Sequence, residues 1–404
     1  MGDKSVFSDR AVLVINCGSS SVKFALLDPA TGAREFEGTG ERLGTPEAAL
    51  RFESGGTKTD IPLPDAGHEE VLREAMRCGA SARPPAGIGH RVVHGGEKFT
   101  GSVLIDDEVL GAINECAALA PLHNPANLMG IEVAGRLFPG LPQVAVFDTA
   151  FHQTLPRHAF LYAIPYRLYE EQKIRRYGFH GTSHHFVSLE AARLLGRDPA
   201  GLNLLTAHLG NGCSACAVRG GRSVDTTMGL TPSEGLVMGT RSGDVDPALP
   251  QFLQDKSGMR LAEITRMLNS ESGLLGLSGL SNDMRTLREA QSAGNERAEI
   301  AIEVFCYRLA KSLLGLAAAL DRVDAVVFTG GIGEHAADVR ERTMRRLAVL
   351  GVRPDPEKNA LNGAASGGIV SAGTSAIPCL VVPTNEEWMI AKETARVLDG
   401  LVAA

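Results

Sequence analysis

Two segments half a chain apart follow one pattern: an apolar strand, a polar turn that contains glycine, and a second apolar strand. They are residues 11–27, with a turn at 16–21, and residues 202–218, with a turn at 210–212. Apolar and β-branched runs broken by Gly, Ser or Asn predict strand, turn and strand. The segments share this pattern rather than their residues, so by themselves they indicate an internal duplication only weakly.

The first turn carries groups that suit an anion. Asn16 and the serines at 19–21 offer side-chain donors and acceptors, and Gly18 allows a ligand to approach the backbone. Lys23 adds a positive charge just beyond the turn, and this combination suits a phosphate group. An ordinary solvated hairpin tip explains the same residues equally well, so this stretch leaves both interpretations open.

The composition argues against several classes of function. A chain of 404 residues, 44% hydrophobic and 22% charged, is typical of a soluble globular protein with two domains. The net charge of −7 argues against a nucleic-acid partner. No apolar run approaches the ~20 residues of a membrane span, and the run 11–15 is too short for a signal peptide.

The cysteines indicate a reducing compartment. Seven cysteines, an odd number, are scattered mostly within apolar segments, as expected for buried thiols in a cytoplasmic protein. Cys213 and Cys216 form a CxxC pair, but no second pair is present to complete a zinc site. On a strand the two thiols would point to opposite faces, so we expect them to be structural.

A glycine pattern near the end of the chain has two interpretations. Gly331-x-Gly333-x-x-Ala336 follows an apolar strand and precedes a helix, as in dinucleotide-binding proteins. No complete βαβαβ unit follows, and no acidic residue ends a second strand about 20 positions later. A glycine loop at a helix start still favours a nucleotide. Because no P-loop motif occurs, an ATP site would be assembled from hairpin turns and separate glycine loops.

A series of segments, in order, resembles the signature segments of the acetate kinases: VLVINCGSSSVKF, HRVVHGG, PLHNP, FDTAFH, RRYGFHGTSH, HLGNG, TRSGDVDP, NDMR, TGGIGEH and PTNEE. They extend from residue 12 to residue 387 and cover essentially the whole chain. The resemblance implies an α/β fold of the actin/Hsp70/sugar-kinase superfamily, with two duplicated actin-like (RNase H-like) domains and an active-site cleft between them. We expect the N-terminal domain at 1–149, joined by the C-terminal helix 386–404. The C-terminal domain, with most of the nucleotide site, is expected at 150–385.

This resemblance implies a reversible reaction, the direct in-line transfer of the γ-phosphoryl group of ATP to acetate, which gives acetyl phosphate and ADP. Arg91 and Arg241 are expected to flank the carboxylate and the migrating group, because two anions repel and guanidinium forks match both. His180 is assigned to the equatorial oxygens of that group, and His123 supports it. Asp148 matches the family's catalytic carboxylate. Acetate is already ionised near pH 7, so a role as base and a role in orienting Arg91 or a metal-bound water both stay open.

The remaining site residues follow from the same resemblance. Mg²⁺, or alternatively Mn²⁺, is expected near Asn16 and Glu386, because one carboxylate together with phosphate oxygens and water suits that ion. Nucleotide contacts are expected from Lys23, His208, Leu209, Gly210, Asn211, Gly212, Asp283, Met284, Arg285, Gly331, Ile332, Gly333, Glu334 and His335. The acyl group is expected to contact Arg91, Val93, Leu122 and Pro232.

Three residues bear on specificity or depart from the family pattern. Val93 is β-branched and is expected to narrow the acyl slot in favour of acetate, although one methylene is worth only ~1–3 kcal/mol. His335 stands where the family commonly has Asn, which leaves the purine contacts open. Trp388, beside the Glu386 and Glu387 pair, has no explanation in the sequence.

Three alternative functions are a propionate or short-chain fatty acid kinase, a non-catalytic ATP-driven switch of the same superfamily, and a dehydrogenase that uses the 331–336 glycine loop. The switch would need neither paired arginines nor a small apolar pocket. The expected partners are the small molecules acetate and ATP, with no nucleic acid and no membrane. The resemblance further implies a homodimer.

Overall fold

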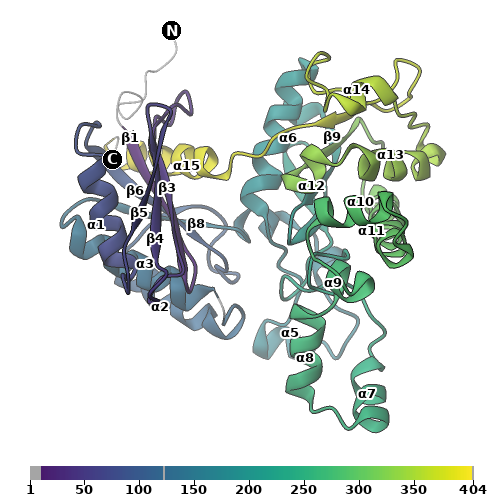
Figure 1. Ribbon diagram of the computed structural model, residues 1–404, viewed down its shortest axis with the longest axis horizontal. Coiled ribbons are helices and arrows are strands. Elements are labelled where there is room, and N and C mark those ends of the chain that lie inside the picture. The colour runs from purple at the N-terminus through teal and green to yellow at the C-terminus, as the bar shows by residue number, and fades with distance from the viewer. Residues whose placement is uncertain (1–10, 122, 403–404) are drawn as a thin grey trace. The chain divides into compact units, whose positions relative to one another are not determined.

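The structure, a computed structural model, describes residues 11–121 and 123–402. The chain divides into two compact units, Met1–Phe151 with Asn385–Ala404, and His152–Thr384. The sequence predicted domain boundaries at 149/150 and 385/386, and the observed units meet at 151/152 and 384/385. Each unit is built around one mixed β-sheet (Figure 1).

The first unit contains an eight-stranded sheet in the order β5-β4-β3-β2-β1-β6-β8-β7. Strands β1 to β5 form an antiparallel meander, and β6 and β8 continue the sheet parallel to β1. The strands are β1 Ala11–Cys17, β2 Ser21–Leu27, β3 Arg34–Glu41, β4 Ala49–Ser54, β5 Thr57–Pro62, β6 Pro85–Val92, β7 Val103–Leu104 and β8 Gln143–Phe147. The helices are α1 His68–Cys78, α2 Asp107–Glu115, η1 Cys116–Ala118, α3 Asn124–Leu137 and α15 Glu386–Val402, and η2 Ala150–Thr154 spans the passage to the second unit.

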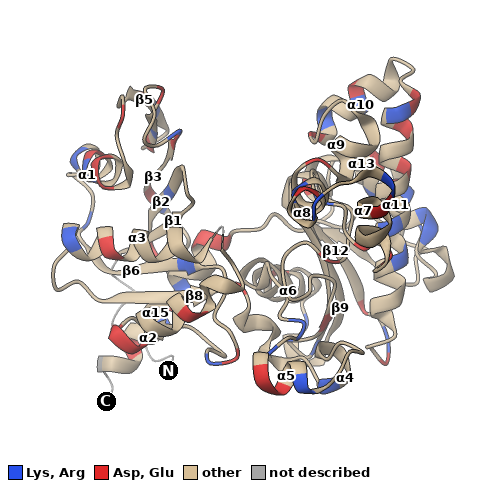
Figure 2. Ribbon diagram, turned by 90° about the horizontal axis from the view of Figure 1, so that it is seen from below, with Lys and Arg blue, Asp and Glu red and all other residues tan. Residues whose placement is uncertain are grey.

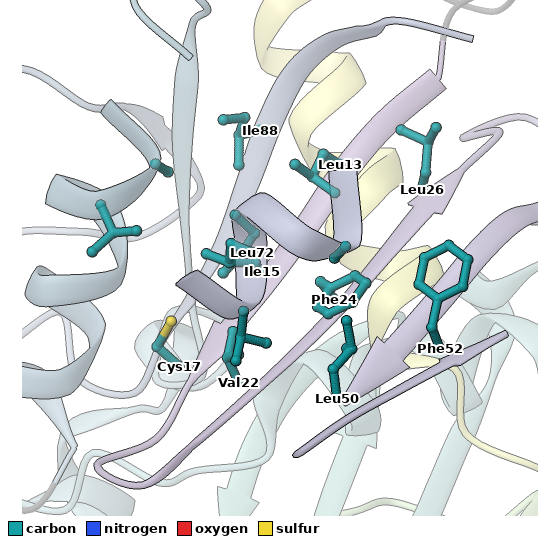
Figure 3. Packing of buried hydrophobic residues seen from close by; sticks show 14 of the residues in the cluster. Leu13, Ile15, Cys17, Val22, Phe24, Leu26, Leu50, Phe52, Leu72 and Ile88 are labelled. Atoms are coloured by element: carbon teal, nitrogen blue, oxygen red, sulfur yellow. The ribbon is translucent and has the colours of Figure 1, made fainter. Parts of the chain in front are cut away.

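Strand β1 is apolar at every position from Ala11 to Ile15 because both of its faces are covered. Leu13 and Ile15 point into a cluster that also contains side chains of α1 and α3 (Figure 3). Val12 and Val14 point to the other face and pack with α15. Burial of each such side chain contributes about 1.5–3 kcal/mol, so the continuous apolar run is what places this strand in the middle of the unit.

Two glycines of β6 let α15 approach the sheet closely. A Cβ on Gly87 would lie 2.5 Å from Leu398 Cδ1, and a Cβ on Gly89 would meet the side chains of Thr394 and Ile390. Any larger residue at these positions would push the helix outward. The C-terminal helix therefore depends on glycines that lie about three hundred residues earlier in the chain.

The second unit contains a five-stranded sheet in the order β11-β10-β9-β12-β13. Its strands are β9 Asn203–Leu209, β10 Cys213–Arg219, β11 Arg222–Thr226, β12 Ala325–Thr329 and β13 Cys379–Val381. Order and direction repeat those of β3-β2-β1-β6-β8, with antiparallel β11, β10 and β9 and parallel β12 and β13. The predicted α/β class and its duplication are therefore confirmed. By position within the strand, the counterpart of Asn16 is His208.

Helices cover both faces of the second sheet. The helices of the second unit are α4 Arg157–Phe160, α5 Arg167–Gln172, α6 Gly181–Leu195, η3 Pro199–Gly201, α7 Leu249–Ser257, α8 Leu261–Ser270, α9 Gly273–Ser278, α10 Met284–Ser292, α11 Glu296–Ala317, α12 Gly330–His335, α13 Ala337–Arg346, η4 Ala348–Leu350 and α14 Pro356–Ala360. Among them, α6 and α11 pack on β9. Helix α11 has one apolar stripe, which is buried and consists of Ile302, Phe305, Leu309 and Leu313. Both signs of charge occur on α10 and α11 (Figure 2).

One local expectation differs from the structure. Asn16 lies within β1 rather than in the turn, which is limited to residues 18–20. The strand continues through this polar residue, which periodicity of apolar residues alone does not detect. The C-terminal helix α15 begins at Glu386, the residue at which the sequence predicted its start.

The cysteines behave as expected. All seven thiols are free, and Cys213 and Cys216 are buried in β10, where burial raises the pKa of each to about 12. Across the described residues 11–121 and 123–402, no helix has the length and apolar character needed to cross a membrane.

Candidate active site

The alternation of side chains brings four polar groups to one edge of the first sheet. The apolar face under α15 ends where β1, β6 and β8 end, and the next side chains there are those of Asn16, Arg91 and Asp148. Lys23 is paired with Asn16 between β1 and β2, so it projects from the same face. Because β1, β6 and β8 are parallel, their carboxyl ends meet at one edge, where α/β sheets commonly bind ligands.

Arg91 lies between two carboxylates at this edge. Its Nε and Nη2 donate to the two carboxylate oxygens of Asp148 at 3.2 and 2.6 Å, and Nε lies 3.8 Å from Glu386 Oε2. The side chain of Asp148 is 1% exposed, whereas those of Arg91 and Glu386 are 23% and 25% exposed. Burial lowers the pKa of Arg91, but the carboxylates of Asp148 and Glu386 outweigh it and the pKa is raised. Asp148 thus holds the Arg91 guanidinium on its buried side, and part of the Arg91 side chain remains exposed to solvent.

The expected metal ligands belong to the same edge. The pKa of Glu386 is raised, mainly by burial. The charges of Arg91 and Lys23 lower this pKa, and those of Asp148 and Glu387 raise it, but the net shift is upward. The donor set of one carboxylate and the Asn16 amide oxygen is of the hard-oxygen kind that Mg²⁺ prefers. Among the described residues no group of three or more His, Cys, Asp or Glu is arranged to hold a metal. A Mg²⁺ ion here would therefore depend on phosphate oxygens and water for the rest of its shell.

The segment after β6 is held by buried side-chain amides. Asn127 Oδ1 accepts the backbone N–H of Val93 at 3.1 Å, and Asn124 Oδ1 accepts that of His94 at 3.1 Å. Val93 itself is buried, with 7% of its surface exposed. His123 lies at the N-terminal end of α3. Leu122, the third expected pocket residue, lies outside the described residues.

In the second unit, His180 ends a chain of hydrogen bonds. Ser214 Oγ lies 2.9 Å from His180 Nδ1 and 2.8 Å from His184 Nε2, and His184 Nδ1 lies 2.7 Å from Thr206 Oγ1. Burial, and then the nearby His152 and His208, lowers the pKa of His184 well below its ordinary value, so His184 is neutral and carries one N–H.

A neutral His180 with its proton on Nε2 requires one order of donation along this chain. Thr206 donates to His184, His184 donates to Ser214, and Ser214 donates to His180. The backbone of His180 is left-handed, with φ of 56° and ψ of 24°. Such strain costs about 1–3 kcal/mol and occurs preferentially at functional sites.

His208 lies beside His180 and not in the cavity described below. The two imidazole rings stack with centroids 4.3 Å apart. His208 Nδ1 contacts Ser183 Oγ at 2.8 Å, and this hydroxyl also contacts Thr384 Oγ1 at 2.8 Å. The adjacent rings and hydroxyls form a polar layer between β9, β10 and α6.

Arg241 is carried by a tightly folded loop. Its Nη1 donates to the carbonyl oxygen of Pro232 at 3.0 Å, and the carbonyl of Arg241 accepts the N–H of Met238 at 3.1 Å. A Cβ on Gly212 would lie 3.4 Å from both Arg241 Nη1 and His180 Nε2. The Arg and His groups therefore converge on the glycine turn between β9 and β10, and burial lowers the pKa of Arg241.

A cavity of about 310 Å³ in the second unit is lined by glycine loops and polar side chains. Eight expected nucleotide residues line it: Gly210, Asn211, Asp283, Met284, Arg285, Gly331, Ile332 and His335. Leu209 and Gly333 are buried behind this surface, and Glu334 accepts the N–H groups of Gly330 and Thr384 at 3.0 and 3.2 Å. Gly330 has φ of +75°, and a Cβ there would lie 2.8 Å from the carbonyl oxygen of Leu209, so only glycine allows this approach.

Several residues of these sites were not expected from the sequence. Asn282, Arg288 and Ala336 complete the cavity lining. Asn282 and Arg288 lie close to the predicted 283–285 motif in the sequence. This proximity was the only sequence feature that could have placed them in the cavity lining. Ser214 contacts both His180 and His184, and no local pattern marks Ser214 or His184 as part of the site.

The duplicated α/β fold, with a glycine-lined cavity in one unit and clusters of Arg with carboxylate or His, defines a phosphotransferase-like class of protein. The family model described as the acetokinase family matches residues 11–392. The acetate kinase of Deinococcus radiodurans is 55% identical over 392 residues, which cover 96% of this chain and 98% of that protein. The chain belongs to the acetokinase family.

Solved structures agree with this assignment. A propionate kinase from Francisella tularensis is similar with a TM-score of 0.90 and 46% identity, covering 95% of this chain and 98% of that one. The acetate kinase of Porphyromonas gingivalis is similar with a TM-score of 0.90 and 42% identity, covering 96% of this chain and all of that one. The comparisons confirm the predicted family and the class of enzyme, a kinase that uses ATP.

Proposed function

We propose that this enzyme transfers the γ-phosphoryl group of ATP to acetate, reversibly and in line, to give acetyl phosphate and ADP. The main support is the convergence of Arg241 and His180 on the Gly212 turn beside the glycine-lined cavity. A guanidinium and an imidazole N–H donor at a glycine turn suit the equatorial oxygens of a phosphoryl group in transfer.

Arg91 is proposed to bind the acceptor carboxylate. Asp148 occupies one side of its guanidinium and orients it, which favours the orienting role of Asp148 over that of a base. Acetate is ionised near pH 7 and needs no base, but its approach to a polyanion needs positive charge. We therefore propose that Arg91 offsets the charge of the acceptor carboxylate and that Arg241 offsets the charge of the migrating phosphoryl group.

The metal is proposed to be Mg²⁺, held through Asn16, Glu386 and the nucleotide phosphates. When bound, such an ion neutralises charge on the β- and γ-phosphate oxygens. Lys23, opposite Asn16, adds a further positive charge at this edge. A homodimer and a cytoplasmic location remain proposals that rest on the family and on the seven free thiols.

A second candidate acceptor is propionate. It is favoured by the similarity to the F. tularensis propionate kinase, whose identity to this chain is comparable to that of the P. gingivalis acetate kinase. The buried, β-branched Val93 is proposed to favour the shorter acid, although only partly.

Steady-state kinetics with acetate, propionate and butyrate, each with ATP and with GTP, tests these proposals. Acyl phosphate formed in proportion to ADP, with the highest kcat/KM for acetate and ATP, is the expected result. Slow ATP hydrolysis at a rate that does not depend on the carboxylic acid would instead indicate a non-catalytic switch. Binding of NADH would indicate a dehydrogenase.

A further inference from the structure

We propose that Trp388 is a positioning residue for Glu386: it clamps the first turn of α15 to the β2–β3 turn, so that the Glu386 carboxylate stays beside Arg91. This inference rests on the proposed function, in which Glu386 helps to hold Mg²⁺. Trp388 is the only tryptophan of the chain and lies in the first turn of α15.

The indole is held at several points. Its Nε1–H donates to the carbonyl oxygen of Pro29 at 3.0 Å, and Lys392 Nζ lies 3.8 Å from the ring centroid. The backbone N–H of Trp388 donates to Asn385 Oδ1 at 3.1 Å, which caps the start of the helix. The residue therefore has one defined orientation rather than a loose hydrophobic contact.

The turn between β2 and β3 is shaped to receive this ring. Gly32 has φ of +75°, and a Cβ on it would lie 2.7 Å from Trp388 Cδ2, so the ring rests directly on backbone. Asp28 braces the turn, because its Oδ1 accepts the N–H groups of Ala30 and Thr31 at 2.9 and 3.1 Å. A braced turn is a rigid platform for the indole.

Arg34 holds the same helical turn from a neighbouring position. Its Nη2 donates to Glu387 Oε2 at 2.7 Å and to Asn385 Oδ1 at 3.3 Å. Arg34 thus binds Asn385 and Glu387, the residues on both sides of Glu386. Glu386 Oε2 itself lies 3.8 Å from Arg91 Nε. Without such partners a first helical turn has unsatisfied N–H groups and frays, which would release the carboxylate.

The test compares Trp388→Ala and Trp388→Phe with the wild-type enzyme. In Trp388→Ala, the Mg²⁺ concentration for half-maximal acetyl phosphate formation is expected to rise about tenfold or more, the usual scale for residues that orient a metal ligand. Calorimetry is expected to show a matching loss in the Mg²⁺-dependent gain of ADP affinity, with ADP affinity in EDTA unchanged. Trp388→Phe keeps a ring on Gly32 but loses the bond to Pro29, so its rise is expected to be about two- to fivefold.

Leu398→Ala is the matched control. Leu398 is buried near the other end of α15, so its truncation lowers the melting temperature through the same helix without touching its first turn. It is expected to leave the Mg²⁺ dependence unchanged. If Trp388→Ala behaves like Leu398→Ala, Trp388 only packs and the inference is wrong; if Trp388→Ala does not fold, Trp388→Phe decides. A wild-type enzyme that forms no acyl phosphate would refute the proposed function instead.

Discussion

Arg91 and Asp148 form a two-point ion pair at the carboxyl edge of the first sheet, with N···O distances of 3.2 and 2.6 Å. The carboxylate is almost fully buried, and the guanidinium keeps one side exposed. This geometry supports the proposal that Asp148 orients Arg91 and that Arg91 contacts the ligand. An orienting role for Asp148 also agrees with the proposed acceptor, acetate, which is already ionised and needs no base.

Arg91→Ala is expected to lower kcat/KM for acetate by about 10²–10³-fold, because a preorganised cation is lost from the site. Asp148→Asn is expected to lower it by about 10–100-fold, since an amide cannot accept from both guanidinium N–H groups. Coupled assays over a range of acetate concentrations measure both. Arg51→Gln, which disturbs only two exposed ion pairs, with Glu41 and Asp60, serves as the control. A pH profile of Asp148→Asn that loses an acidic limb would instead support a base.

Ser214→Ala is expected to lower kcat by about tenfold with little change in KM for ATP, because His180 loses the partner that places its proton on Nε2. His180→Ala is expected to lower kcat by about 10²-fold or more. Single-turnover measurements separate this effect from nucleotide release. The double variant is expected to be no slower than His180→Ala, because Ser214 acts through His180; additive losses would contradict the chain of hydrogen bonds.

Val93→Ala is expected to raise kcat/KM for propionate relative to acetate, by about five- to 100-fold, because removing two methyl groups opens room for about one methylene. The ratio is read from competition between the two acids in one reaction. Ala145→Gly, which also trims a buried side chain of the first unit, is the control for general loosening. An unchanged ratio would mean that Val93 does not line the acyl pocket.

His90 is expected to make the enzyme less stable in mild acid. Burial lowers the pKa of His90 to about 4, and its ring contacts Gln143 Oε1 at 2.6 Å. The unfolded chain binds a proton near pH 6.5 and the folded one does not. The contribution of His90 is therefore complete above about pH 6.5 and is lost as the pH falls toward 4, by up to about 3 kcal/mol.

Urea unfolding at several pH values measures this effect. His90→Gln is expected to flatten the slope of unfolding free energy against pH between 6.5 and 4. Replacement of the exposed His335 is expected to leave the slope unchanged. Equal slopes for His90→Gln and wild type would show that other groups control acid stability.

The amino-acid sequence by itself determined the class of fold and the family. Apolar runs at β1 and β9 predicted strands, and both strands lie inside their sheets with both neighbours paired. Once β1 and β6 are paired in the sheet, alternation along them places the side chains of Asn16 and Arg91 on one face. Motif segments supplied the expected roles, and no geometry was needed for them.

Only the tertiary structure decided which groups support the site. Trp388 rests on Gly32, Asp148 holds Arg91, and Ser214 joins His180 to His184. Most of these partners are tens to hundreds of residues apart in the chain. Local periodicity records which face a side chain takes, but long-range contacts arise from the packing of whole elements, whose register no single segment encodes.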